Sequence, residues 1–208
     1  MPCNHKFQEY LNLNHLDFNP TTLIVGTFNP EWPLNNHAGW FYGRTNNNYF
    51  WDVLPRLYNQ ESLINSNAEV WKQFCHNNLI AITDLISSIQ DAHIENAQHN
   101  MWLGNYGDNN ITQNFQGQVL VDIIGLLINN PTITNVYLTR GSGEQFWGDI
   151  WNPVRDFCDA NDIDCKELLT PSSNARFQQG RYNRHNPDHQ LNLADFILMR
   201  WQQQWHHL

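Results

Sequence analysis

The sequence predicts an α/β fold, a three-layer α/β/α sandwich with a mainly parallel four-stranded sheet. Short apolar runs rich in β-branched residues alternate with segments of helical periodicity along the 208 residues. The runs are almost continuously apolar, as expected for strands that helices cover on both faces. No internal repeat and no Gly/Ser/Pro linker divides the chain, so we expect a single domain over residues 1–208.

The four expected strands share an apolar, β-branched composition and occupy residues 22–28, 78–85, 133–140 and 165–170. Helical periodicity predicts helices over residues 49–58, 68–76, 119–129, 144–160 and 193–205. Ligands bind at the carboxyl ends of the strands in such a sheet. Nearly all of the Gly, Pro, aromatic and amide residues follow strand ends, so we expect the functional site at that edge.

Composition limits the possible functions. Apolar residues make up 41% of the chain, which also has nine Trp, so it is typical of a packed globular protein. The formal net charge is -9, which excludes non-specific coating of nucleic acid and restricts any such role to a local basic patch. No apolar run is long enough to cross a membrane and the start of the sequence is not a leader peptide, so we expect a soluble cytoplasmic protein.

The four cysteines do not have the spacing of a metal site. Cys3, Cys75, Cys158 and Cys165 form no C-x-x-C pair, so we expect free, mostly buried thiols. His185 and His189 are four residues apart, but Pro187 lies between them and disfavours a helical metal pair. We therefore assign no metal.

Polar groups follow the first two expected strands. Gly26 in the GTFNP segment permits close approach of a ligand to the backbone, although an ordinary turn before Pro30 is an equal alternative. Asp84 ends the second strand, where an ionised carboxylate can accept a hydrogen bond from a ligand N–H or orient a water molecule. The alternative for Asp84 is capping of the following turn.

Two further segments carry possible chemistry. In FYGRTNNNYFW, at 41–51, aromatic residues and an Asn run precede a helix, and an Asn cap beside core aromatics is the simpler interpretation. In LLTPSSNARF, at 168–177, hydroxyl and backbone N–H groups are suited to a phosphate. Arg176, Arg181 and Arg184 follow within nine residues and form the expected local basic patch on a loop; a merely solvated loop is the alternative.

In this order the segments resemble the uracil-DNA glycosylase superfamily, in particular its thymine, mismatch-specific uracil and hypoxanthine branches. Residues 26–30 resemble the family's first loop, and Asn48, Phe50 and Trp51 fit its N-x-F-W segment. Residues 171–176, PSSNAR, resemble its P-S-S-S-A-R motif, with Asn in place of the third Ser. The resemblance covers most of the chain in outline and leaves the branch, and thus the excised base, open.

The resemblance implies a monofunctional DNA glycosylase that hydrolyses the N-glycosidic bond of a flipped uracil, mismatched thymine or hypoxanthine, without a cofactor. It implies a monomer that acts on DNA with a damaged or mismatched base. Asn29 would position the water, with Asn48 as its rival, and Asp84 would read the base edge. The base pocket would include Gly26, Thr27, Phe28, Tyr42, Ser172 and Ser173. The contacts to DNA would come from Asn174, Arg176, Arg181 and Arg184.

Two other functions are compatible with the sequence. A hydrolase of small nucleosides or nucleotides would need no phosphate track, which suits the net charge of -9. A superfamily member without catalysis would serve as a nucleic-acid or partner binding module. Base release and the salt dependence of DNA binding separate these functions.

Overall fold

A four-stranded parallel sheet forms the centre of the protein in the computed structural model, which describes residues 1–32, 36–105 and 107–206. The strand order is β3-β2-β6-β7, and each neighbouring pair is parallel. The strands are β2 (Thr22–Gly26), β3 (Ile80–Asp84), β6 (Asn135–Leu138) and β7 (Asp164–Glu167). Each strand overlaps one of the four predicted runs, so the predicted sheet is confirmed.

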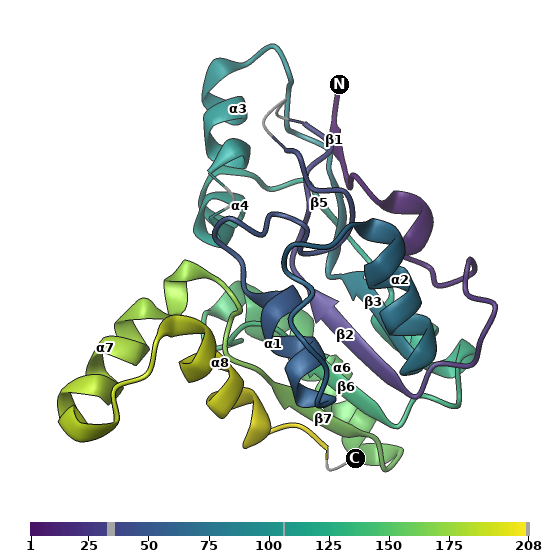
Figure 1. Ribbon diagram of the computed structural model, residues 1–208. Helices are drawn as coiled ribbons and strands as arrows, with labels where there is room; N and C mark the ends of the chain where they lie inside the picture. Colours follow the sequence, from purple (N-terminus) through teal and green to yellow (C-terminus); the bar gives the residue numbers. More distant parts are fainter. Residues whose placement is uncertain (33–35, 106, 207–208) are drawn as a thin grey trace.

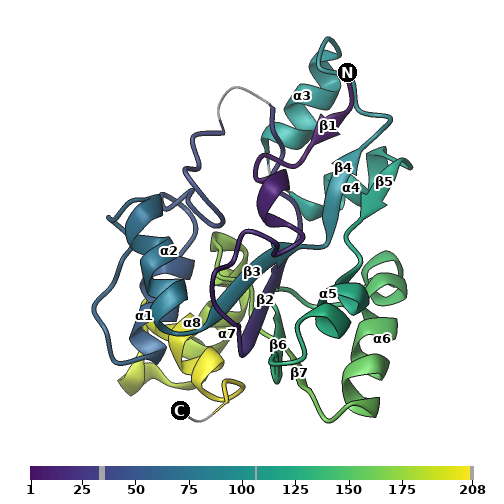
Figure 2. The same cartoon turned by 90° about the vertical axis from the view of Figure 1, so that its right-hand side faces the viewer.

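Helices cover both faces of this sheet, as predicted (Figure 2). One face is covered by α1 (Phe50–Leu57), α2 (Ala68–Asn77) and α8 (Leu193–Gln202). The other face is covered by α5 (Ile123–Asn129) and α6 (Gln145–Ala160). Alternate residues of β2 serve the two cores: Leu23 and Val25 pack with the α6 side, whereas Ile24 packs with the α1 side. The continuous apolar character of the strands follows from this double burial.

A second, smaller sheet was not predicted. Its strands pair antiparallel in the order β1 (Cys3–Asn4), β4 (Ile86–Ile89) and β5 (Gln118–Leu120). Only Leu85 separates β3 from β4, so the chain passes directly from the parallel sheet into the small sheet. The helix predicted over 119–129 was wrong at its start: β5 occupies residues 118–120, and α5 begins after Asp122, whose carboxylate accepts the N–H of Gly125.

Further helices lie between β4 and β5 and after β7, and one short 3-10 turn precedes β2. These are α3 (Ala97–Gly104), α4 (Asp108–Asn114), α7 (Arg176–His185) and the short 3-10 turns η1 (Gln8–Tyr10), η2 (Ser173–Ala175) and η3 (Pro187–His189). Figure 1 shows α3 and α4 beside the small sheet, and α7 projecting from the body. The predicted loop was wrong for the α7 segment, which lacks apolar periodicity because none of its residues is buried.

The described parts of the chain contain no helix that is both long and apolar enough to cross a membrane. All four cysteines are free, and three of them are buried as expected; Cys165 is partly exposed.

Candidate functional site

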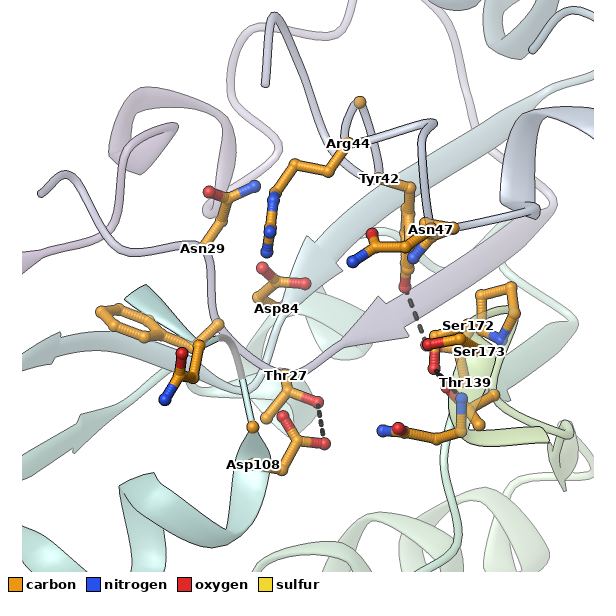
Figure 3. A pocket seen from close by; sticks show the side chains of 18 residues that line it. Thr27, Asn29, Tyr42, Arg44, Asn47, Asp84, Asp108, Thr139, Ser172 and Ser173 are labelled. Carbon is orange, nitrogen blue, oxygen red and sulfur yellow. Dashed lines mark hydrogen bonds between the residues drawn. The ribbon is translucent and has the colours of Figure 1, made fainter. Parts of the chain in front are cut away.

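A cavity of about 240 Å³ lies at the carboxyl edge of the parallel sheet (Figure 3). Asp84 at the end of β3 and Thr27, Thr139 and Thr170 beyond the ends of the other strands line it. The cavity contains most of the residues that the sequence singles out. They are Thr27, Phe28, Asn29, Tyr42, Asn48, Asp84, Ser172, Ser173 and Asn174. The structure therefore brings the three sequence segments and the strand-end carboxylate together.

Backbone pairing joins the second segment to the third. Asn48 and Ser172 form an isolated antiparallel bridge. The N–H of Tyr49 donates to the carbonyl of Pro171 at 2.6 Å, and the N–H of Ser173 donates to the carbonyl of Asn47 at 3.2 Å. These bonds satisfy the backbone of both loops and fix the distance between them. Pairing between segments so far apart in sequence leaves no local signal from which it could be predicted.

Asp84 is paired with His5, a residue that the sequence did not single out. His5 Nε2 lies 2.7 Å from Asp84 Oδ2, and His5 is only 2% exposed. The backbone N–H of Phe7 donates to His5 Nδ1 at 3.0 Å, so in the neutral ring the hydrogen is on Nε2 and is donated to the carboxylate. Burial raises the pKa of Asp84, and the bond from His5 opposes that rise.

The orientation of the Asn29 amide follows from its neighbour Asn36. The N–H of Ala38 donates to Asn36 Oδ1 at 3.2 Å, and Asn36 Nδ2 donates to the carbonyl of Pro30 at 2.6 Å. The same Nδ2 lies 2.6 Å from Asn29 and therefore requires an acceptor there, which is Asn29 Oδ1. The Nδ2 of Asn29 is then turned toward Arg44, as Figure 3 shows. Asn29 consequently offers a hydrogen-bond donor to the cavity.

Gly26 lies directly beneath the Asp84 carboxylate and the Tyr42 hydroxyl. A Cβ atom at Gly26 would lie 2.1 Å from Asp84 Oδ1 and 2.7 Å from Tyr42 Oη. Only glycine leaves room for these two oxygens at the end of β2. Gly26 therefore serves the site through its lack of a side chain, although it does not line the cavity.

Tyr42 is held rigidly as a wall of the cavity. Its ring stacks on Phe50 with centroids 3.8 Å apart and planes at 5°, and its backbone has a φ of 55°. Thr139 Oγ1 donates to the carbonyl of Val25 at 3.3 Å and so accepts the hydroxyl hydrogen of Tyr42 at 2.9 Å. Burial, followed by the charge of Asp84, raises the pKa of Tyr42 well above its usual range. A neutral, fixed ring of this kind is suited to packing against a planar ligand.

Asp108 and Arg140 form an ion pair that the sequence analysis missed. Asp108, the first residue of α4, accepts from Arg140 Nη1 at 2.7 Å and from Thr27 Oγ1 at 3.3 Å. The guanidinium of Arg140 also lies 3.8 Å from the ring centroid of Trp147. Burial raises the pKa of Asp108, and Arg140 lowers it. The position of Arg140 just after the third strand was the available sequence signal.

Arg44 brings a cation into the cavity. It is the only Lys or Arg among the described residues that line this cavity. Its guanidinium extends between Asn29 and Asn47 toward Asp84 (Figure 3). Arg44 belongs to the FYGRTNNNYFW segment, so its place in the motif was a signal that sequence reasoning did not use.

The arginines of the predicted basic patch lie outside the cavity lining. Arg176, Arg181 and Arg184 are exposed on α7, a helix and not the expected loop. A second cavity of about 650 Å³ shares Gly107, Asp108, Thr170 and Asn174 with the first. It is also lined by Gln178 of α7, so it extends the site toward this helix.

The described residues include no group of three or more His, Cys, Asp or Glu side chains that could hold a metal ion. The side chains of the cavity are instead amides, hydroxyls, carboxylates and aromatic rings, which suit hydrogen bonding and stacking on a polar planar ligand.

Comparison with known proteins supports the fold. No protein-family model and no curated protein sequence matches the chain. The chain is similar in structure to the solution NMR structure of "a putative Uracil DNA glycosylase" from Methanosarcina acetivorans, with a TM-score of 0.52 and 16% identity. The match covers 88% of this chain and 92% of the other. At this identity the likeness shows a common fold and leaves activity to be argued from the site.

Proposed function

We propose that this protein is a monofunctional DNA glycosylase that hydrolyses the N-glycosidic bond of a flipped uracil-, thymine- or hypoxanthine-type base. The observation that carries this proposal is the convergence of Asn29, Asn48, Asp84 and Ser172 on one cavity at the carboxyl edge of the sheet. A fold shared with a protein named as a glycosylase adds support.

The polar groups of the cavity match the edge of a lactam base. Asn29 Nδ2 donates to a base carbonyl, because its Oδ1 is already bonded to Asn36. Asp84 accepts a hydrogen bond from the adjacent base N–H or from the attacking water, and the ionised carboxylate is the stronger acceptor for both. The geometry favours Asp84 over Asn29 as the acceptor for water. Phe28 and Tyr42 pack against the base faces.

The reaction needs few groups. The bond between the base nitrogen and C1′ breaks with its electron pair on the base, water adds to C1′, and the base anion takes up the released proton. Arg44 supplies positive charge for the departing anion at the moment it forms. Asn48 Oδ1 accepts the N–H of Phe50 at 2.9 Å. The Nδ2 of Asn48 is therefore a further hydrogen-bond donor for the departing base.

The DNA contacts extend from the cavity toward α7. Ser172, Ser173 and Asn174 at the cavity rim bind a phosphate beside the flipped nucleotide. Arg176, Arg181 and Arg184 on α7 bind the flanking backbone, and Arg176 fills the space that the flipped base leaves. These positive charges are exposed and close together on one helix, because a chain of net charge -9 can attract DNA only through a local basic patch.

The test is base release from end-labelled duplexes that carry uracil, thymine or hypoxanthine opposite each normal base, followed by alkaline cleavage. We expect release from at least one duplex by the parent protein, and loss of release in D84N. D149N is the matched control, because Asp149 is exposed on α6, away from the cavity. Release only from free deoxynucleosides would favour the small-molecule hydrolase, and duplex binding without release would favour the binding module.

A further inference from the structure

The N-terminal segment of residues 3–7 is hydrogen bonded both to the loop after β2 and to strand β4. The N–H of Lys6 donates to the carbonyl of Asn29 at 2.8 Å, and Lys6 Nζ donates to the carbonyl of Asn36 at 2.6 Å. The N–H of His5 donates to the carbonyl of Ser87 at 2.8 Å, just beyond Asp84. The segment thus links the loop after β2 to the junction of β3 and β4.

We propose that His5 is a positioning residue for the reaction, one that keeps Asp84 ionised and aims its Oδ1 at the cavity; this inference rests on the proposed function. His5 binds Oδ2, at 2.7 Å, and leaves Oδ1 above Gly26 beside Tyr42 Oη. A single fixed donor thereby sets the plane of the carboxylate.

The apolar surroundings of His5 indicate that its ring nitrogens are needed for hydrogen bonding and not for packing. Its ring packs among Phe7, Phe28 and Phe41, with centroid distances of 5.9, 5.8 and 5.5 Å. An apolar ring would suit such a site better if the position served packing alone, because a buried polar group is costly without a partner. The hydrogen on Nε2 has Asp84 as its partner, so the polar edge serves the carboxylate.

His5 also contacts the residue proposed to stack on the base. Its ring meets Phe28 edge to face, and Phe28 lines the cavity. One buried side chain therefore supports both the hydrogen-bonding partner and the stacking partner of the ligand. We expect a change at His5 to alter the bond-breaking step more than the affinity for duplex DNA.

Other charged or titratable groups face Asp84 and must be considered in any pH experiment. Tyr42 faces it across Gly26, and Arg44 points toward it from the opposite loop (Figure 3). Asp108 of α4 is near enough for its pKa to be raised by the charge of Asp84. These groups are unchanged in a His5 variant, so a difference between variants reports the His5 bond itself.

The experiment compares single-turnover base release by the parent, H5L and H5Q as a function of pH. Leu removes the donor, whereas the side-chain amide of Gln places a donor near the former Nε2. Loss of the donor should raise the pKa of Asp84, because burial then acts without opposition from His5. We expect the acidic limb of the rate profile to move upward by about 1 to 2 pH units in H5L, the range for a hydrogen bond to a charged group. H5Q should recover a large part of that shift.

F7L is the control for damage to packing, because Phe7 touches the His5 ring and supplies only its backbone N–H to the pair. We expect F7L to lower stability without moving the acidic limb. An unmoved limb in H5L, or an equal shift in F7L, would overturn the proposal.

A second measurement remains informative if the parent releases no base and the proposed function fails. Carbon-13 NMR titration of the Asp84 carboxyl should give a higher pKa in H5L than in the parent, with H5Q between them. Equal titration of Asp84 in the three proteins would refute the coupling of His5 to Asp84, whatever the parent's activity.

Discussion

Replacement of Gly26 by Ala tests the crowding at the end of β2. The added Cβ would lie 2.1 Å from Asp84 Oδ1 and 2.7 Å from Tyr42 Oη, far inside contact distance. Neither neighbour can move freely, because His5 holds Asp84 at 2.7 Å and Phe50 stacks on Tyr42. The backbone of Gly26 does not have a positive φ, so the effect is steric and not conformational.

The magnitude follows from these contacts. Overpacking a core position costs about 1–3 kcal/mol, and a 2.1 Å approach places G26A in the upper part of that range. Ala also lowers the backbone entropy of the unfolded chain, which offsets about 0.4–1 kcal/mol of this loss of stability. We expect a net loss of roughly 1.5–2.5 kcal/mol, which for a chain of this size lowers the Tm by about 3–10 °C.

Urea unfolding and calorimetry measure the stability, and G143A is the control because nothing lies within 4 Å of a Cβ there. We also expect G26A to lose most base release, since Asp84 or Tyr42 must shift. The double variant G26A/D84A should lose less stability than the sum of the single changes, because the clash with Oδ1 is removed. Parent-like stability and release in G26A would refute the reasoning.

Three further predictions concern charge and the amide groups. Asn29→Ala should slow single-turnover release about a hundredfold with duplex binding nearly intact, because a donor to the base carbonyl matters most as the base departs with negative charge; unchanged release would move that donor role to Asn48. Asp84 has a raised pKa in the fold, so its contribution to stability falls as pH rises through the range between its unfolded and folded pKa. The stability of D84N relative to the parent should therefore increase across that range in urea titrations, and a constant difference would contradict this. Fluorescence anisotropy measures the binding constant for duplex DNA as a function of salt concentration. A plot of the logarithm of the binding constant against the logarithm of the salt concentration should have a slope of about -2 to -4, and Arg176→Ala should make it shallower by about one. A slope steeper than about -6 would contradict a local basic patch.

The sequence predicts the central sheet well because its strands are buried on both faces. That burial favours apolar side chains at most positions of 22–26 and 80–83, and such runs stand out from their polar surroundings. The strand ends follow from the runs, so the place of Thr27 and Asp84 at the cavity follows as well. This is the part of the site that local patterns determine.

The remaining parts depend on contacts that no local pattern records. The strand β5 is three residues long and half exposed, so its apolar residues resemble the start of a helix. Helix α7 buries none of its residues and shows no periodic apolar face. His5 stands in a short polar segment, and its role appears only when that segment lies beside Asp84. Tertiary pairing determines each of these features.

The residues that form the cavity come from distant parts of the sequence, and this has a consequence for the folding of the site. Groups from His5 to Asn174 contribute to or support the cavity, so nearly the whole chain must be in place before the cavity exists. Contacts of such long sequence separation form late and slow the folding of parallel sheets. A truncated chain that ends before residue 170 would thus contain all four strands of the parallel sheet and Asp84, but it would lack the lining residues 170–174 and so have no enclosed cavity. The cavity would be completed only when the loop after β7 pairs with residues 47–49.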